Sequence, residues 1–269
     1  MQIGKPIELH GKPVAGGKFP LICTPLVGGT RDAILAEAQV VLAKKPDILE
    51  WRVDFFDNIA DTPAVIELAA HIKGMAGDTA LLFTRRSVRE GGEEIALPED
   101  DVIGLYAAVC NSRQIDIIDF EMSNDASHIA KVREASRAND VKLILSFHNF
   151  SFTPAPNTLA QRFLQADQLG ADIAKVAVMP RNLEDVLALL SATLAASQKL
   201  RIPLISLSMG PYGSLTRLFG WTFGSALTFA VGASSSAPGQ VPIEDLNTVL
   251  AILQKSLPVR GGSILTQNG

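Results

Sequence analysis

The sequence predicts an α/β protein in which eight strand–helix units close into a (β/α)8, or TIM, barrel. Three observations support this prediction. Short runs rich in Val, Ile and Leu alternate along the chain with segments of helical periodicity. Eight such runs occur, and continuous apolar runs are typical of parallel strands covered by helices. The length of 269 residues is close to the roughly 250 residues of a typical barrel of this kind.

The predicted elements follow one another in strand–helix order. Strands are expected at 20–27, 47–53, 80–85, 115–121, 141–147, 172–178, 203–208 and 226–231. Helices are expected at 30–44, 63–75, 98–111, 125–139, 158–169, 183–199 and 242–255. Several of these helices begin at a Ser, Thr or Asp cap or carry a proline in the first turn. Residues 1–18 are expected to form a β-hairpin that closes the barrel floor. No linker or second domain is evident, so residues 1–269 are expected to make one domain.

An open, doubly wound parallel sheet is the alternative architecture that the same alternation allows. Such sheets commonly carry a glycine-rich phosphate-binding fingerprint after a strand. Neither GxGxxG nor GxxxxGK[ST] occurs in this sequence. The closed barrel is therefore the preferred prediction.

Composition and charge narrow the range of functions. The chain is 47% hydrophobic and 19% charged, which excludes an intrinsically disordered protein. A net charge of −4 gives no general attraction for nucleic acid or an anionic membrane, so neither partner is expected. No signal-peptide or membrane-spanning segment is found. Cys23 and Cys110 lie singly in apolar runs, which is typical of buried free thiols in a reducing, cytoplasmic compartment.

Charged residues occupy inward-facing positions of two predicted strands. Strand side chains alternate between the two faces of a sheet. In 47–53 the large apolar side chains share one face, which leaves Glu50 and Arg52 pointing into the barrel. The same alternation at 80–85 places Arg86 at the barrel mouth. These charges indicate either a structural ion pair or ligand contact at the mouth, where active sites of this fold lie.

Arg86 has an alternative interpretation, because it belongs to a cluster with Arg85 and Arg89 that is also typical of a solvated basic turn. The loop at 232–240 has two interpretations as well. Its glycine, serine and proline content is typical of a mobile lid after the last strand, or of a plain surface loop.

A lysine in the middle of an apolar strand is the most informative position. Lys175 interrupts 172–178, and lysine is rarely buried without a partner. It indicates either half of a buried ion pair or an amine whose nucleophilic form is favoured by desolvation and nearby cations. His148, at the exit of 141–147, is either a structural residue or an acid–base group. No metal site is predicted, because no ligand-spaced His, Cys or acid cluster accompanies these residues.

Four short motifs occur in the order and spacing of a known family. They are Glu50-Trp51-Arg52-Val53-Asp54, Ser146-Phe147-His148-Asn149-Phe150, Ala174-Lys175-Val176 and Ser236-Ala237-Pro238-Gly239-Gln240. In these motifs the chain resembles the type I 3-dehydroquinate dehydratases, from about residue 21 to residue 253. The resemblance implies a (β/α)8 barrel, usually a homodimer, that needs no metal or organic cofactor. It also implies conversion of 3-dehydroquinate to 3-dehydroshikimate in the shikimate pathway.

The resemblance further implies a role for each matching residue. Lys175 would form a Schiff base with the substrate ketone. His148 would act as the general acid–base group, and Glu90 would orient it. Arg217 would bind the substrate carboxylate. The remaining matches would hold the ring hydroxyls or contact substrate from the lid, and they are Glu50, Arg52, Arg86, Ser236 and Gln240.

Other functions stay open at this point. A class I aldolase uses the same lysine chemistry on sugar phosphates, but it commonly binds phosphate through glycine-rich loops after the last two strands. Arg217 and 236–240 suit a carboxylate and hydroxyls better. A non-catalytic barrel that senses a cyclic acid would have no need of a nucleophilic Lys175. Quinate catabolism uses the same dehydration and is an alternative to aromatic biosynthesis.

Overall fold

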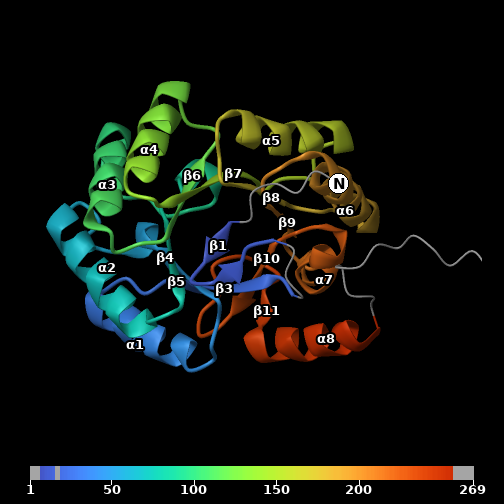
Figure 1. Cartoon of the computed structure of the whole chain (residues 1–269), viewed down its shortest axis with the longest axis horizontal. Coiled ribbons are helices and arrows are strands. Elements are labelled where there is room, and N and C mark those ends of the chain that lie inside the picture. Colours follow the sequence, from blue (N-terminus) through green and yellow to red (C-terminus); the bar gives the residue numbers. More distant parts are fainter. Residues whose placement is uncertain (1–6, 16–18, 257–269) are drawn as a thin grey trace, which may run out of the picture.

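Eight parallel strands lie at the centre of the computed structural model, which describes residues 7–15 and 19–256 (Figure 1). They are β3 (Leu21–Leu26), β4 (Ile48–Arg52), β5 (Ala80–Thr84), β6 (Ile117–Glu121), β7 (Lys142–Asn149), β8 (Ile173–Val178), β9 (Leu204–Ser208) and β10 (Leu227–Val231). From β3 to β9 each strand pairs with the next along the chain, and β10 pairs with β3. The ring closes between β9 and β10, where the Ala226 amide donates to the Leu204 carbonyl at 2.7 Å. The predicted barrel is therefore confirmed.

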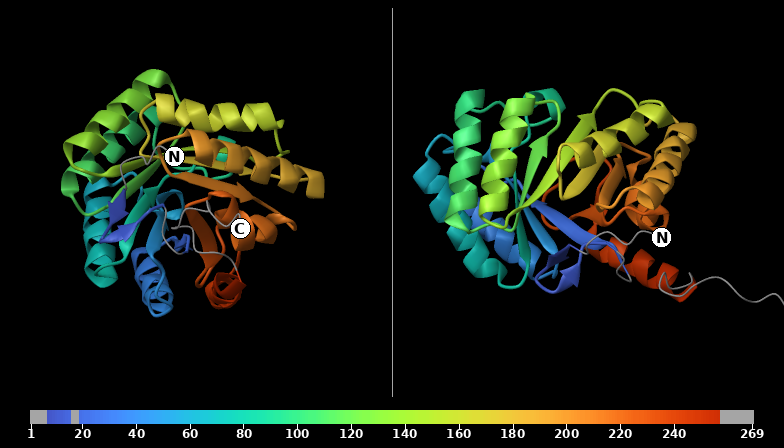
Figure 2. Two further views of the ribbon diagram at one scale, coloured as in Figure 1. Left: turned by 45° about the vertical axis from the view of Figure 1, so that its right-hand side comes forward. Right: turned by 45° about the horizontal axis from the view of Figure 1, so that its top comes forward.

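Helices surround the strands on the outside of the barrel (Figure 2). They are α1 (Arg31–Leu42), α2 (Thr62–Ala76), α3 (Glu99–Ser112), α4 (Ala126–Ala138), α5 (Pro156–Gln168), α6 (Leu183–Lys199), α7 (Gly213–Phe219) and α8 (Ile243–Ser256). Short 3-10 helices lie at η1 (Val53–Phe55), η2 (Val88–Glu90) and η3 (Gly220–Phe223), and the short strand β11 (Val241–Pro242) pairs with β10. Most predicted bounds agree within two residues. Helix α7 was not predicted, because seven residues are too few to show a helical period.

The two faces of the strands carry separate apolar layers. Outward-facing Leu49, Trp51 and Phe83 pack with the helices in the largest hydrophobic cluster. Inward-facing Ile48 and Leu82 belong to a second cluster inside the barrel. The predicted alternation of inward-facing and outward-facing side chains is thus confirmed. Burial of these apolar side chains stabilises the fold by about 25 cal/mol for each Å² of apolar surface removed from water.

A short antiparallel hairpin closes the floor of the barrel. Strands β1 (Glu8–Leu9) and β2 (Lys12–Pro13) pair with each other, and Leu9 and Val14 are buried against the inner apolar cluster. Gly11 has a φ of 76°, which suits the tight turn between the strands. The described part of the predicted hairpin is therefore confirmed, while residues 1–6 and 16–18 lie outside the described residues.

Both cysteines, Cys23 and Cys110, are buried free thiols as predicted. Over the described ranges, the helices lack the combination of length and hydrophobicity that a membrane span requires.

Candidate active site

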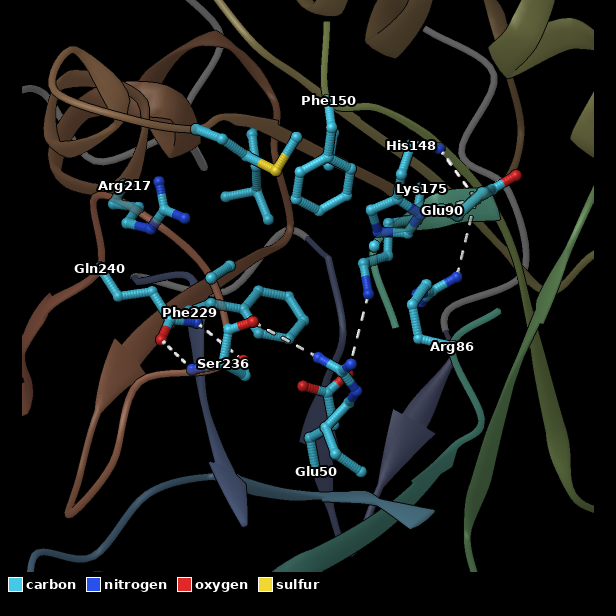
Figure 3. Close-up of a pocket in the computed structure, with 16 residues that line it drawn as sticks. Glu50, Arg86, Glu90, His148, Phe150, Lys175, Arg217, Phe229, Ser236 and Gln240 are labelled. Carbon is cyan, nitrogen blue, oxygen red and sulfur yellow. Dashed lines mark hydrogen bonds and ion pairs between the residues drawn. The ribbon is translucent and has the colours of Figure 1, made fainter. Parts of the chain in front are cut away.

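A cavity lies at the carboxyl ends of the barrel strands (Figure 3). The structure brings all nine residues singled out in the sequence to its wall, and they are Glu50, Arg52, Arg86, Glu90, His148, Lys175, Arg217, Ser236 and Gln240. Apolar side chains complete the lining, among them Phe150, Leu207, Met209 and Phe229. The cavity occupies the end of the barrel at which catalytic sites of this fold are built.

Lys175 points into this cavity from the middle of β8 and is only 4% exposed. Its Nζ donates to Oδ2 of Asp119 at 2.8 Å and lies 3.8 Å from Oε1 of Glu50. The ring of Phe229 lies beside the Lys175 amine, with 4.7 Å between Nζ and the ring centroid (Figure 3). The sequence left two interpretations of Lys175 open, and the structure shows a lysine that is both ion-paired and accessible from the cavity.

Asp119 was not singled out in the sequence, although it is fully buried at the centre of the site. Its Oδ1 accepts hydrogen bonds from the Arg86 guanidinium at 2.8 Å and from Ser146 Oγ at 2.6 Å. Burial alone would raise the pKa of Asp119, but Arg86 and Lys175 lower it to well below its ordinary value. The carboxylate is therefore ionised throughout the neutral range.

Arg86 is buried among acidic side chains rather than solvated. Its Nη2 nitrogen lies 2.8 Å from Oδ1 of Asp119, and its Nη1 nitrogen lies 3.3 Å from Oε1 of Glu121 and 3.8 Å from Oε2 of Glu90. Burial alone would lower the pKa of Arg86, yet Asp119 and Glu121 raise it above its ordinary value. Arg85 is also buried and binds Glu99, on the outside of the barrel. The solvated basic turn is therefore wrong for both arginines, because parallel strands carry their side chains into the two packed layers.

The predicted alternative of an ion pair between Glu50 and Arg52 is not what the structure shows. Arg52 binds Asp54 with Nε at 2.9 Å and the Nη2 nitrogen at 2.6 Å. Glu50 instead accepts a hydrogen bond from Thr84 Oγ1 at 3.0 Å. The reason is local, because the turn at η1 places the Asp54 carboxylate beside Arg52. Asp54 also accepts from the Arg86 amide at 3.1 Å, which joins the ends of β4 and β5.

His148 lies at the mouth end of β7 and is held by Glu90. Ser146 is the register neighbour of Lys175, so His148 lies two residues, or about 7 Å, further toward the mouth. A single oxygen of Glu90, Oε2, contacts His148 Nδ1 at 2.9 Å and its backbone amide at 3.0 Å. Phe150 stacks on the imidazole, with ring centroids 6.5 Å apart. These contacts fix the ring and leave Nε2 without a partner among the described residues.

The protonation of this pair follows from burial and neighbouring charge. Burial, with Arg86 and Lys175 nearby, lowers the pKa of His148 well below its ordinary value. Burial and the charge of Glu121 raise the pKa of Glu90 to about 7. The imidazole is therefore neutral near pH 7. With Glu90 ionised, Nδ1 donates to the carboxylate and Nε2 is free to accept a proton.

Arg217 has no acidic partner among the described residues, unlike Arg52 and Arg86. It reaches the cavity from α7, and one of its terminal nitrogens donates to the Ser208 and Gly213 carbonyls at 2.6 and 3.1 Å. Its Nε is buried and makes no hydrogen bond within the described ranges. Burial lowers the pKa of Arg217 to about 10, so the side chain is still charged at neutral pH. Its positive charge is thus available to an anion in the cavity.

The loop at 232–240 lies across the cavity and is attached to both sides of the mouth. Arg52 donates to the Ser236 carbonyl at 3.4 Å, and Arg217 donates to the Pro238 carbonyl at 3.3 Å. Gln240 Oε1 accepts from the Ser236 amide at 3.1 Å, and Gln240 Nε2 donates to Ser236 Oγ at 3.3 Å (Figure 3). The polar groups of this loop therefore face the same space as Lys175.

Comparison with known proteins agrees with this geometry. The sequence profile of the family described as type I 3-dehydroquinase matches residues 22–257. A 3-dehydroquinate dehydratase of Albidiferax ferrireducens is 71% identical over 257 residues, covering 96% of this chain and 97% of that protein. The 3-dehydroquinate dehydratase of Aromatoleum aromaticum is 53% identical over 257 residues, covering 96% of this chain and 99% of that protein.

Solved structures give the same result. The crystal structure of 3-dehydroquinate dehydratase from Geobacillus kaustophilus has a TM-score of 0.92 and 48% identity to this chain, covering 96% of this chain and 100% of that one. The structure of a type I 3-dehydroquinate dehydratase from Clostridium difficile with covalently modified comenic acid has a TM-score of 0.91 and 38% identity to this chain. The match covers 95% of this chain and 100% of that one. From the profile match, the curated relatives and the barrel with its polar cavity, the chain belongs to the type I 3-dehydroquinase family.

Proposed function

We propose that this hydro-lyase removes water from 3-dehydroquinate to give 3-dehydroshikimate through a Schiff base on Lys175. One observation carries the proposal: a buried lysine and a neutral imidazole face the same cavity from neighbouring strands. The ketone of the substrate is the electrophile that a desolvated amine attacks. The hydrogen beside that ketone needs a base near neutrality, which is the role to which a histidine is suited.

Arg217 is the group best suited to the substrate carboxylate. The other cations of the cavity, Arg52, Arg86 and Lys175, are each paired with an acid of the described chain. A buried guanidinium without an acidic partner gains most from a carboxylate ligand, because two parallel hydrogen bonds then neutralise its charge. Glu50, Arg52 and Arg86 would then lie on the hydroxyl side of the ring, with Ser236 and Gln240 above it.

The first half of the reaction builds an electron sink. The Lys175 ammonium first gives one proton to water, and the lone pair of the resulting amine attacks the ketone carbon. The hydroxyl group formed on that carbon takes a proton back from water as it leaves as water, so the C=N nitrogen keeps one hydrogen and carries a positive charge. His148 Nε2 then accepts the proton from the neighbouring carbon. The electrons of that C–H bond form a C=C bond, and the C=N electrons return to Nζ, which becomes neutral. Glu90 balances the imidazolium that results.

The second half expels the hydroxyl group. The Nζ lone pair re-forms the C=N bond, the C=C electrons move to make the new double bond of the ring, and the C–O bond breaks. The departing oxygen takes the proton from His148 and leaves as water. A second water hydrolyses the C=N bond, which releases 3-dehydroshikimate and regenerates Lys175. One imidazole thus acts first as base and then as acid, a contribution of about 10²–10⁴-fold in rate.

Reductive trapping tests this proposal. We expect protein mixed with 3-dehydroquinate and borohydride to gain mass on the peptide that contains Lys175. An unreduced sample should show the absorbance of 3-dehydroshikimate. Lys142→Ala is the matched control, because Lys142 begins the neighbouring strand β7 outside the cavity lining. Product without an adduct would exclude the Schiff base. A folded protein that gives neither would indicate an aldolase or a sensor of cyclic acids.

A glycine in the loop provides a second test. Gly239 has a φ of 79°, and a Cβ placed on it would lie 2.1 Å from the Gly210 carbonyl oxygen. Gly239→Ala is therefore expected to displace Ser236 and Gln240 from the cavity and to raise KM by at least about tenfold, the equivalent of 1.4 kcal/mol. Ser234→Ala, in an exposed part of the same loop, is the control in steady-state kinetics. An unchanged KM in Gly239→Ala would show that the loop does not contact substrate.

The family resemblance also supports action in the shikimate pathway and in the cytoplasm, with two chains per molecule. Light scattering of the purified protein tests the last point, because a homodimer has twice the mass of the chain.

A further inference from the structure

Asp119 and Lys175 form a short, buried ion pair at the cavity wall. Oδ2 of Asp119 lies 2.8 Å from Nζ, and the two side chains are 0% and 4% exposed. They come from β6 and β8, and Ser146 of the intervening strand β7 donates to the other oxygen of Asp119 at 2.6 Å. The carboxylate is thus held through both of its oxygens, because Arg86 and Ser146 bind Oδ1 and Lys175 binds Oδ2.

The other buried acids around Lys175 and Arg86 are less suited to balance charge on Nζ. Glu50 Oε1 is 3.8 Å away and already accepts the hydroxyl of Thr84. Glu121 accepts the Ser87 amide at 2.7 Å and its hydroxyl at 2.5 Å, while Glu90 binds His148. Within the described residues, Asp119 alone makes a direct hydrogen bond to the Lys175 nitrogen.

We infer that Asp119 is the counter-ion of Lys175 both as the ammonium of the free enzyme and as the protonated imine. This inference rests on the proposed Schiff-base function. An ammonium carries three hydrogens, whereas a protonated imine carries one. The single remaining N–H needs an acceptor that is already in place, and Asp119 Oδ2 occupies that place. A buried cation without such a partner loses its proton.

The consequence for the reaction is direct. Only the protonated imine withdraws electrons strongly enough to help His148 remove the neighbouring proton. When the C=N electrons return to nitrogen, Nζ becomes neutral and Asp119 loses one of its two cations. Arg86, 2.8 Å from the other oxygen, then balances the carboxylate. The pairing of one carboxylate with two cations therefore suits a nitrogen whose charge appears and disappears within each turnover.

Asp119→Asn tests the counter-ion, because it removes the charge and keeps the shape. We expect the alkaline limb of the kcat–pH profile to move down by about one to three pH units, the usual effect of an adjacent opposite charge. Cyanoborohydride reduces the protonated imine. At high pH it should therefore trap the imine of the wild-type protein well and the imine of the variant poorly. The two proteins should be trapped alike at low pH, and Asp119→Glu should restore part of the shift.

Glu121→Gln is the matched control. It removes one carboxylate from the same strand and the same face, but this carboxylate binds Arg86 and Ser87 instead of Lys175. Its alkaline limb should remain within a few tenths of a pH unit of the wild-type position. Equal shifts in the two variants, or no shift in Asp119→Asn, would overturn the inference.

A second measurement does not depend on Asp119→Asn folding. His148→Ala should accumulate the imine, so the protein labelled with ¹⁵N at lysine Nζ can report its protonation by NMR from pH 6 to 9. A protonated nitrogen over this range supports the counter-ion, and a neutral one at pH 7 overturns it. Failure to trap wild-type protein at any pH would instead refute the Schiff base itself, so the two failures are distinguishable.

Discussion

Lys175→Ala is expected to lower kcat by at least about 10⁴-fold while the barrel remains folded, because the proposed covalent route depends entirely on this amine. Arg86 still pairs with Asp119 in this variant, so the buried carboxylate keeps a partner. Turnover is followed by the absorbance of 3-dehydroshikimate, and folding by circular dichroism. Borohydride should add no mass to the variant.

Lys175→Arg separates loss of the nucleophile from loss of charge. A guanidinium beside Asp119 preserves the ion pair but does not form an imine with a ketone. We therefore expect this variant to be as inactive as Lys175→Ala and to melt closer to the wild-type protein. Substantial turnover in either variant would contradict covalent catalysis at this position.

His148→Ala is expected to have the second-largest effect, a decrease in kcat of about 10²–10⁴-fold. The reason is that, in the proposed mechanism, imine formation and proton removal use different groups. Lys175 retains Asp119, Glu50 and Phe229 around its nitrogen, so the amine can still attack the ketone. The variant should therefore give a borohydride adduct on Lys175 in yield at least equal to the wild-type protein, together with very slow release of product.

The control for this variant is His128→Ala, since His128 lies on α4, outside the cavity lining. Its turnover should equal that of the wild-type protein. If His148→Ala failed to form the adduct as well as the product, His148 would be needed for the covalent step. If it kept full activity, another group would have to remove the proton.

The alternation of strand side chains predicted part of the site from simple physics. A parallel strand inside a ring of helices must bury both faces, so a charge on it needs a partner or a ligand. This rule found Glu50, Arg52, Arg86 and Lys175, and the structure places all four in the cavity. The alternation rule applies to residues within or next to strands, because the backbone there fixes the direction of each side chain.

The same rule would have found Asp119 and Glu121, which share the inward face of β6 with Ile117. These two acids interrupt an otherwise apolar strand in the same way as Lys175 does. Arg217 and Ser236 are different, because α7 is too short for a periodic pattern and the loop at 232–240 has none. Composition indicated only that 232–240 is a lid or a surface loop, and the resemblance to a family assigned Arg217 and Ser236 to the site. Their place depends on contacts made across the barrel mouth.

The packing of the barrel floor determines how substrate enters the cavity and how product leaves it. Beneath Lys175 the interior is filled by buried apolar side chains such as Ile144 and Ile173, and the hairpin residue Leu9 packs against the same cluster. We therefore expect the cavity to be closed on the side of the hairpin, with Ser236, Ala237 and Gln240 of the loop at 232–240 in its lining. Substrate and product must then use the same passage in turn, so 3-dehydroshikimate has to depart before the next 3-dehydroquinate enters. We therefore expect product inhibition that is competitive with substrate, which steady-state kinetics with added 3-dehydroshikimate would test.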